Sequence, residues 1–356
     1  MTPSDNNLPK NQSESFFARL KEKVDHYFEV QNTRPTGDAN LFLKGLFQSA
    51  CAILLYAVLV FFAPSIWLAI PLAILLGFNL AILGFNIMHE GGHQSFSSYR
   101  WLNSLAGYTL NILGGNIYFW KVKHNVNHHT FTNIEGIDSD IDVRPFMRLH
   151  PNQSLHSIHR YQHIYWFVLY GISYIAWVFY EDFAKYFKGR IASHMKPMNL
   201  PLREHIIFWM TKIFYVVIFL AIPVMWLGWI KAIIGFLIVS CSCGLFISIV
   251  FQLAHVVVGN DFPVSKKIET EWAIHQINTT SNFGTSNKFL FWTLGGLNFQ
   301  IEHHLFPKIS HIHYPQISRL VKETCREFDI VYNEYASMAQ ALAAHLFYLR
   351  KMGTAL

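Results

Sequence analysis

The sequence predicts an all-α integral membrane protein, with four transmembrane helices in two hairpins and a cytoplasmic helical cap that carries clustered histidines. Three observations lead to this prediction. Of the 356 residues, 52% are hydrophobic and 14% are charged, whereas a soluble domain has about 25% charged residues. Four segments are apolar over about 20 residues, the length that crosses a bilayer. The chain also contains 19 histidines, more than structural roles normally require.

The N-terminal 40 residues are expected to form a cytoplasmic segment outside the bilayer. Residues 1–15 are polar and predict a loose tail, whereas 16–32 predict an amphipathic helix. The stretch "MTPSDNNLPKNQSESFFARL" lacks the apolar core of a signal peptide, so we expect no cleaved leader.

A membrane domain is predicted over 41–320, and cytoplasmic C-terminal helices are predicted over 321–356. The domain is built on two helical hairpins with short connections, the first of which turns at "APSI". Each arm of a hairpin is apolar over enough residues to span the bilayer. The four predicted spans are 41–62, 67–88, 205–227 and 230–253.

Two further apolar stretches, 101–119 and 160–180, are expected to lie flat in the membrane interface. They contain the Trp, Tyr and Arg side chains that favour the boundary between lipid and water. If 160–180 alone crossed the bilayer, the histidines near 90 and 125 would face one side and those near 304 the other. The interfacial interpretation keeps all of them together.

The basic residues mark the side on which both termini and the histidines are expected to lie. Of the 28 Lys and Arg residues, 25 fall in 1–40, 89–204 and 254–356, which the four spans place on one side. The positive-inside rule makes that side cytoplasmic.

Composition also argues against other classes of protein. The net charge of +6 is not gathered in a basic tract, so it fits an anionic membrane surface better than nucleic acid. None of the four cysteines belongs to a CxxC pair, and three lie within apolar runs. This usage fits a reducing compartment without a disulfide framework.

The first histidine cluster, "HEGGH", follows the second predicted span. His89 and His93 share one face if the helix continues. Gly91 and Gly92 would allow another element or a ligand to approach closely. The spelling also matches the HExxH motif of zinc proteases, with Glu90 as the acid. A zinc-dependent membrane hydrolase is therefore an alternative.

Two further clusters, "HNVNHH" and "QIEHH", each end in adjacent histidines. Neighbours on a helix diverge by about 100°, so the two rings of a doublet could serve different metal ions. One more histidine ends the fourth span in "FQLAH", on the same predicted side. The eight histidines expected to bind metal are His89, His93, His124, His128, His129, His255, His303 and His304.

Eight imidazoles predict a site for two metal ions. A structural zinc takes four ligands and a catalytic zinc takes three, and neutral imidazole suits zinc, copper, iron or nickel. Metal-bound histidines usually donate their second nitrogen to an outer partner, for which Asp138, Asp140 and Gln252 are the candidates. His275 is a further candidate for the site. The other histidines are expected to be solvated or hydrogen-bonded: His26, His150, His156, His159, His163, His194, His205, His311, His313 and His345.

The three clusters resemble the histidine boxes of membrane fatty acid desaturases, which read HxxxH, HxxHH or HxxxHH, and HxxHH or QxxHH. The resemblance covers about 40–320. Gln300 in the last box, with "NTTSNF" and "GGLNFQIEHHLFP", resembles the front-end branch, which adds a double bond between an existing one and the carboxyl end. His255 matches an additional ligand of the wider family.

The resemblance implies a di-iron centre, dioxygen as co-substrate, and a fatty acyl lipid or acyl-CoA as substrate. Gln300 would be a weak ligand, an outer contact of the metals or part of an open coordination position. Trp120, Phe119 and Phe299 are candidates for the wall of an acyl tunnel, although ordinary packing is the default for each. A membrane hydroxylase or ketolase would use the same metals and remains an alternative.

The electron donor is expected to be a separate ferredoxin or cytochrome. Many front-end enzymes carry a fused cytochrome domain with a His-Pro-Gly-Gly motif, which this sequence does not contain. In this respect the chain resembles bacterial acyl-lipid or acyl-CoA desaturases, which implies a bacterial inner membrane. Regioselectivity, acyl chain length and oligomeric state stay open.

Overall fold

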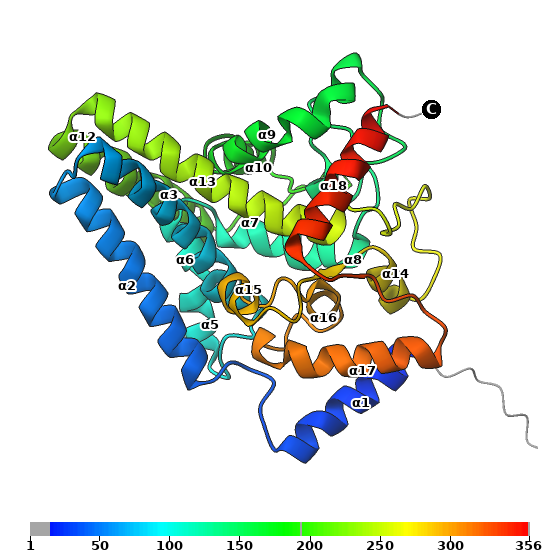
Figure 1. The fold of residues 1–356 in the computed structure, drawn as a ribbon. Coiled ribbons are helices and arrows are strands. Elements are labelled where there is room, and N and C mark those ends of the chain that lie inside the picture. The colour runs from blue at the N-terminus through cyan, green and yellow to red at the C-terminus, as the bar shows by residue number, and fades with distance from the viewer. Residues whose placement is uncertain (1–14, 193, 355–356) are drawn as a thin grey trace, which may run out of the picture.

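The computed structural model describes residues 15–192 and 194–354. It shows long apolar helices at one end and shorter helices gathered at the other (Figure 1). The predicted N-terminal tail, except Ser15, lies outside the described residues. The chain is mostly helical, with one departure from an all-α fold: β1 (Asn282–Phe283) and β2 (Glu334–Tyr335) pair in parallel.

Helices occupy all four predicted spans. Two of them contain a π-helical turn, and α13 is a single helix of 27 residues that ends at a candidate metal ligand. The bounds are α2 (Ala39–Phe61); α3 (Ile66–Leu83), η1 (Gly84–Met88) and α4 (His89–His93); α11 (Leu202–Val216), η6 (Val217–Ala221) and α12 (Ile222–Leu227); and α13 (Trp229–His255).

A fifth helix, Ser157–Lys188, is also long and apolar enough to cross a membrane. It occupies the stretch that the sequence places in the interface, and length and composition do not separate the two arrangements. The helix comprises η4 (Ser157–Tyr161), α9 (Gln162–Ala176), η5 (Trp177–Glu181) and α10 (Asp182–Lys188).

The fifth helix packs against α13 and contacts two distant elements at its ends. Gly244 of α13 allows the close approach, because a Cβ there would lie 2.6 Å from the carbonyl oxygen of Gly171. Near the end of α10, the Tyr186 hydroxyl lies 2.8 Å from Nδ1 of His205, at the start of α11. At the other end, Gln162 donates to the carbonyl of Leu349 in α18 (Met338–Gly353).

The stretch 101–119 is divided into short helices that are too short to span a bilayer. These are α5 (Arg100–Gly107), α6 (Thr109–Ile112) and the first part of α7 (Ile117–Lys121). Trp101, Leu105 and Ile112 expose more than half of their surface, as expected for a segment that rests on lipid.

The remaining helices form a cap over the inner ends of α3 and α13 (Figure 1). In the cap, α1 (Phe16–Gln31) lies where the sequence predicts a helix over 16–32. It buries Phe16, Leu20 and Val24 along one face, against α17. The other cap elements are η2 (Val122–His128), α8 (His129–Phe131), η3 (Ser139–Ile141), α14 (Trp272–Asn278), α15 (Lys288–Leu294), α16 (Gln300–Leu305), η7 (His311–His313) and α17 (Tyr314–Glu327).

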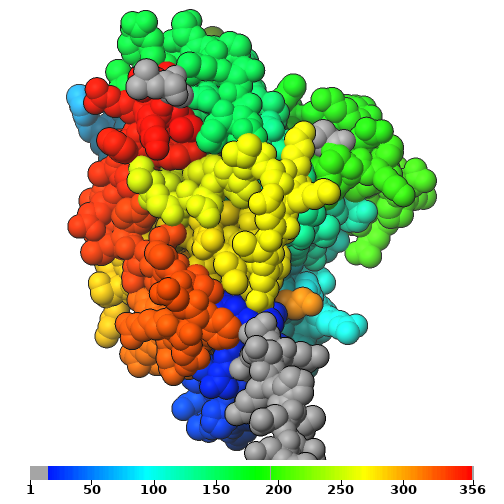
Figure 2. Space-filling model, turned by 90° about the vertical axis from the view of Figure 1, so that its right-hand side faces the viewer, coloured from blue at the N-terminus to red at the C-terminus, as the bar shows by residue number. Residues whose placement is uncertain are grey.

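Segments far apart in the sequence meet on one face of the cap. Figure 2 shows the loop and helix between α13 and β1 beside α17 and the N-terminal helix. Glu271, at the start of α14, accepts hydrogen bonds from the backbone N–H groups of Phe16 and Phe17, at 3.1 and 2.8 Å. The first turn of α1 is thereby tied to α14.

Candidate metal centre

Four separate elements bring the eight predicted histidines together at the inner end of the helices. The end of α4, the segment η2–α8, the last residue of α13 and α16 each contribute. Ligand atoms in three overlapping groups lie within 4.8 Å of one another. The groups are His89, His93, His124 and His303; His128, His255 and His304; and His129, His303 and His304.

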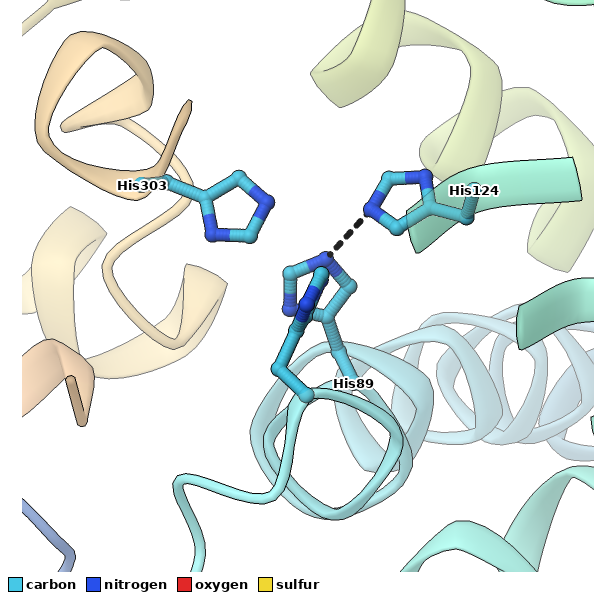
Figure 3. Close-up of side chains that lie close together, drawn as sticks. His89, His124 and His303 are labelled. Carbon is cyan, nitrogen blue, oxygen red and sulfur yellow. Dashed lines mark hydrogen bonds between the residues drawn. The ribbon is translucent and has the colours of Figure 1, made fainter. Parts of the chain in front are cut away.

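The shortest contacts have the spacing of two ligands on one ion. Nε2 of His124 lies 3.2 Å from Nε2 of His89 and 3.2 Å from Nε2 of His129. Figure 3 shows the rings of His89, His124 and His303 pointing toward one central space. Two imidazoles bound about 2.0–2.1 Å from one metal at tetrahedral or square angles stand about 3 Å apart.

Several inward nitrogens are buried and unsatisfied. Nε2 of His93, His128, His303 and His304 has no hydrogen-bond partner among the described residues. Buried polar atoms in folded proteins are nearly always paired, and these four point into one cluster of imidazoles. Metal ions would satisfy all four, so the donor set fits a metal centre.

Outer partners fix which nitrogen faces inward. Nδ1–H of His128 donates to Asp138 at 3.1 Å, and Nδ1–H of His304 donates to Oε1 of Gln276 at 2.7 Å. Nδ1 of His303 lies 3.3 Å from the Tyr314 hydroxyl. Each contact leaves the lone pair on Nε2 for a metal.

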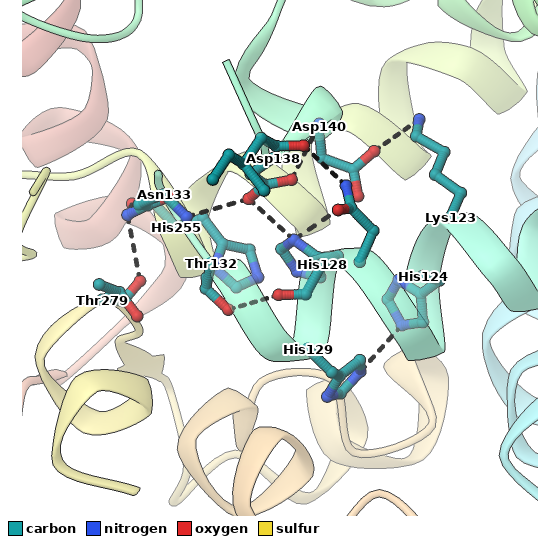
Figure 4. Close-up of polar contacts among 12 residues, drawn as sticks. Lys123, His124, His128, His129, Thr132, Asn133, Asp138, Asp140, His255 and Thr279 are labelled. Carbon is teal, nitrogen blue, oxygen red and sulfur yellow. Dashed lines mark hydrogen bonds and ion pairs between the residues drawn. The ribbon is translucent and has the colours of Figure 1, made fainter. Parts of the chain in front are cut away.

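Of the predicted outer partners, Asp138 and Asp140 lie beside His128 (Figure 4). Asp140 pairs mainly with Lys123, at 2.5 Å, and stands 3.6 Å from the His128 ring. Gln252 is buried one turn before His255. Its Oε1 has no hydrogen-bond partner in the described part of the chain, and the residue lines the cavity beside His89 and His124.

Gln300 contacts the histidine cluster, whereas His275 lies outside the ligand groups of the described residues. Nε2 of Gln300 lies 3.0 Å from Nε2 of His255, so the amide reaches the metal-facing atom of that ring. His275 is buried but belongs to none of the ligand groups within the described residues. Its neighbour Gln276 makes the contact with His304 instead. No local pattern in the sequence marks Gln276 or Tyr314 as partners.

Glu90 of "HEGGH" is not placed to act as the general base that a zinc protease needs. Oε1 of Glu90 accepts a hydrogen bond from the backbone of His311 and lies 2.7 Å from Nδ1 of the same residue. Its other oxygen accepts from the Ser95 hydroxyl at 2.9 Å. The carboxylate therefore holds a cap segment. His311, which the sequence places among the ordinary histidines, is its buried partner.

The two glycines of the first box admit neighbouring elements. A Cβ on Gly92 would collide with the ring of Trp120, and one on Gly91 would meet Asn103 and the backbone of Gly107. The close approach that the sequence predicts is thus made by other parts of the chain.

Burial favours neutral, metal-binding imidazoles in the cap. Burial lowers the pKa of His124, His129, His303 and His304, and neighbouring histidines lower it further. At His128, burial alone would lower the pKa, but the charge and hydrogen bond of Asp138 outweigh it and raise the pKa. Neutral imidazole is the form that binds transition metals.

A cavity of about 270 Å³ lies against the histidines. His89, His124 and Gln300 line it on the histidine side, and further wall comes from η1, α9, η5, α10, α13 and the segment 139–143. Trp120 lines this cavity, whereas Phe119 and Phe299 pack in apolar clusters and do not line it. A larger cavity of about 470 Å³ lies between α2, α3 and α13, and none of the eight histidines lines it.

Apolar helices, a cluster of inward-facing imidazoles and an adjoining cavity define a membrane protein with a group of histidines that could hold metal. Comparison with known proteins narrows this class. The family model for fatty acid desaturases matches residues 65–336, and the chain belongs to that family. The identification from the histidine boxes is confirmed, and the protein is an oxidoreductase.

Related proteins align over nearly the whole chain. The sn-1 linoleoyl-lipid 6-desaturase of Arthrospira platensis is 36% identical over 359 residues, which cover 99% of this chain and 96% of that protein. The protein of the same name from Synechocystis sp. is 33% identical over 97% of both chains. The acyl-lipid (8-3)-desaturase of Physcomitrium patens is 34% identical over 96% of this chain and 72% of its own.

Proposed function

We propose that the protein uses dioxygen and two iron ions to insert a cis double bond into the acyl chain of a membrane lipid, on the carboxyl side of an existing double bond. The observation that carries this proposal is the set of buried, unpartnered Nε2 atoms in a cluster of imidazoles, two of which, His89 and His124, line a cavity at the end of the apolar helices. The names of the two cyanobacterial relatives support a linoleoyl chain as substrate and carbon 6 as the position.

Two iron positions account for the ligand groups. His89, His93 and His124 would hold one ion, His128, His255 and His304 the other, and His129 and His303 lie between the groups. Nε2 and Oε1 of Gln300 are interchangeable by a flip of the amide. The flipped amide would place its oxygen about 3 Å from Nε2 of His255, at the spacing of a second ligand. We assign Gln300 to that position.

The protein's contribution is to hold ligands, position the chain and exclude water. Bound iron would reduce dioxygen with two electrons and two protons and take hydrogen from two neighbouring carbons, which leaves a double bond and two waters. Asp138, Gln276 and Tyr314 would keep the imidazoles in the metal-binding tautomer. Trp120 and Met88 would form an apolar wall beside His89 that shields the methylene groups of the acyl chain from water.

We infer four transmembrane spans, with both termini and the metal centre in the cytoplasm of a bacterial cell. The contacts of the fifth helix support this topology, because one end meets α18 and the other meets the start of α11. Both are assigned to the cytoplasmic side by the distribution of Lys and Arg. Cysteine labelling at Ser154 and at Lys196, two exposed positions that flank the helix, tests this: both sites should react from the cytoplasmic side only.

We also propose a separate electron carrier, a ferredoxin or a cytochrome. The two cyanobacterial relatives support this arrangement, because this chain aligns with 96% and 97% of their length. With each candidate in its reduced form, turnover by the purified protein should require the carrier and saturate with its concentration.

The central test is expression in a host that lacks desaturases, followed by mass spectrometry of the lipids and metal analysis of the purified protein. Wild type should form new double bonds and contain iron. His303→Ala should form none. His26→Ala, which removes an exposed histidine from α1, should behave as wild type. Double bonds in the His303→Ala cells, or zinc as the only metal together with activity that needs no oxygen, would contradict the proposal.

A further inference from the structure

Gly84 is a buried glycine whose missing side chain leaves open space. It begins the π-helical turn η1 and lines the 270 Å³ cavity beside the histidines. A Cβ built at this position meets no atom within 4 Å. All 20 glycines lie within the described residues. Two others have this property, Gly228 and Gly235, and neither is buried.

Neither the backbone nor the packing of the protein requires a glycine at position 84. Its φ and ψ are −55° and −51°, a right-handed helical conformation that any residue adopts. Glycine is less favourable than alanine inside a helix. A glycine often marks a close approach by another element, as at Gly92 against Trp120, but no atom of residues 15–192 or 194–354 lies within 4 Å of a Cβ at Gly84. The remaining reason for a glycine is the space itself.

This space lies next to the metal centre. The backbone N–H of His89 donates to the carbonyl of Gly84, which closes the π turn. Five residues at a rise of about 1.5 Å place the two positions about 7 Å apart along the helix. Both line the same cavity, so a chain that lies against the metal-facing ring of His89 can extend past Gly84. π turns are common at functional sites.

The wall of the cavity is charged in one part and apolar in another. Lys123, Asp140 and Glu181 come from η2, η5 and the loop after the second histidine box. Phe85 and Leu297, from η1 and the turn before α16, form apolar wall in the same region as Gly84. A polar head group suits the charged part, and the methyl end of an acyl chain suits the part beside Gly84.

We propose that position 84 is a specificity-determining site, where the absent side chain admits the methyl end of the acyl chain beyond the metal centre. The residue at this position sets how many carbons fit between the new double bond and the end of the chain. This inference rests on the proposed desaturase function and adds the chain length that the site accepts.

Gly84→Ala and Gly84→Val test the inference, with Gly235→Ala and Gly235→Val as matched controls. Gly235 is also a helical glycine with open space at its Cβ, but it lines the 470 Å³ cavity away from the histidines. Because a Cβ at position 84 meets no atom within 4 Å, iron content should stay at the wild-type level in Gly84→Ala, and Gly84→Val is compared in protein with wild-type iron content.

The readout is competition between glycerolipids with 16-carbon and 18-carbon dienoyl chains. A single methylene in an apolar pocket changes selectivity by about tenfold or more. We expect Gly84→Val to shift the ratio of 16-carbon to 18-carbon products upward by about tenfold, Gly84→Ala by less, and the Gly235 variants not at all. Binding of the same two lipids, measured by competition without reductant, should shift in parallel.

Two results would overturn the inference. The first is an unchanged ratio in an iron-loaded Gly84→Ala or Gly84→Val protein. The second is a shift of the product ratio in the Gly235 variants and not in the Gly84 variants, which would place the acyl chain in the larger cavity. If wild type forms no double bonds but Gly84→Val still loses binding of the longer chain, the desaturase proposal fails and the role of Gly84 stands.

Discussion

Replacement of Asp138 by asparagine should weaken iron binding without unfolding the protein. The buried carboxylate accepts three hydrogen bonds: from Nδ1–H of His128 at 3.1 Å, and from the backbone N–H groups of Asn133 and Asp140, each at 3.0 Å. Asparagine keeps the shape but has only one acceptor oxygen. At least one of the three donors must therefore face an NH₂ group.

The size of the effect follows from the orientation of the new amide. If the oxygen keeps His128 and Asn133, the Asp140 N–H is left unpaired, at a cost of about 1–3 kcal/mol. If the amide turns over, its NH₂ meets Nδ1 of His128 and forces the ring proton onto Nε2, the metal-facing atom. Outer partners of metal-bound histidines are worth about 10–100-fold in affinity, which is about 1.4–2.7 kcal/mol.

Iron titration of purified wild type and variant measures this difference. Protein dialysed against graded chelator should lose half of its iron at a 10–100-fold lower chelator concentration when Asp138 is asparagine. Asp142→Asn is the control, because that carboxylate in the same loop pairs with Arg144 at 2.6 Å and contacts no histidine. Equal iron affinity in Asp138→Asn and wild type would refute the role assigned to Asp138.

Three further predictions concern other parts of the molecule. Gln300→Ala should lower turnover and change the absorption spectrum of the iron-loaded protein, whereas an unchanged spectrum would show that Gln300 binds no metal. Burial lowers the pKa of His345 to about 4. Between pH 6.5 and 4, His345 is therefore protonated in the unfolded chain but stays neutral in the folded protein. As the pH falls through that window, the free energy of unfolding should fall by up to about 3 kcal/mol. The melting temperature should fall with it in wild type and depend less on pH in His345→Gln. Lys212→Met should cost about 3–5 kcal/mol in detergent unfolding, because Asp182, paired with Lys212 at 2.9 Å, is left buried and alone; Lys231→Met, at an exposed site, should cost little.

The helices and the faces of the histidine boxes could be predicted because both follow from local patterns. The apolar run 41–62 appears as Ala39–Phe61, and the i, i+4 spacing of His89 and His93 places both rings in one ligand group. Asp138 could be proposed as a partner because it lies shortly after the second box in the sequence. Local order in the sequence is sufficient for such features.

Contacts between distant segments could not be predicted in the same way. Gln276 lies 28 residues before its partner His304, and Glu90 lies 221 residues before His311. No periodicity links such pairs, because the approach depends on how the cap folds over the spans. The fifth helix is ambiguous for a related reason: its composition suits both a crossing and an interfacial position, and its packing depends on segments distant in the sequence.

The attachment of α1 to α14 has a practical consequence for preparing the protein. Phe17 packs edge-on against Trp272 with ring centres 5.4 Å apart, and the Trp272 indole donates to the carbonyl of His129 at 3.1 Å. On the same short helix, Gln276 holds His304. Shortening the protein through α1 to obtain better-behaved samples should therefore loosen two candidate metal ligands at once, and such samples should be checked for metal content before inactivity is attributed to the reaction conditions.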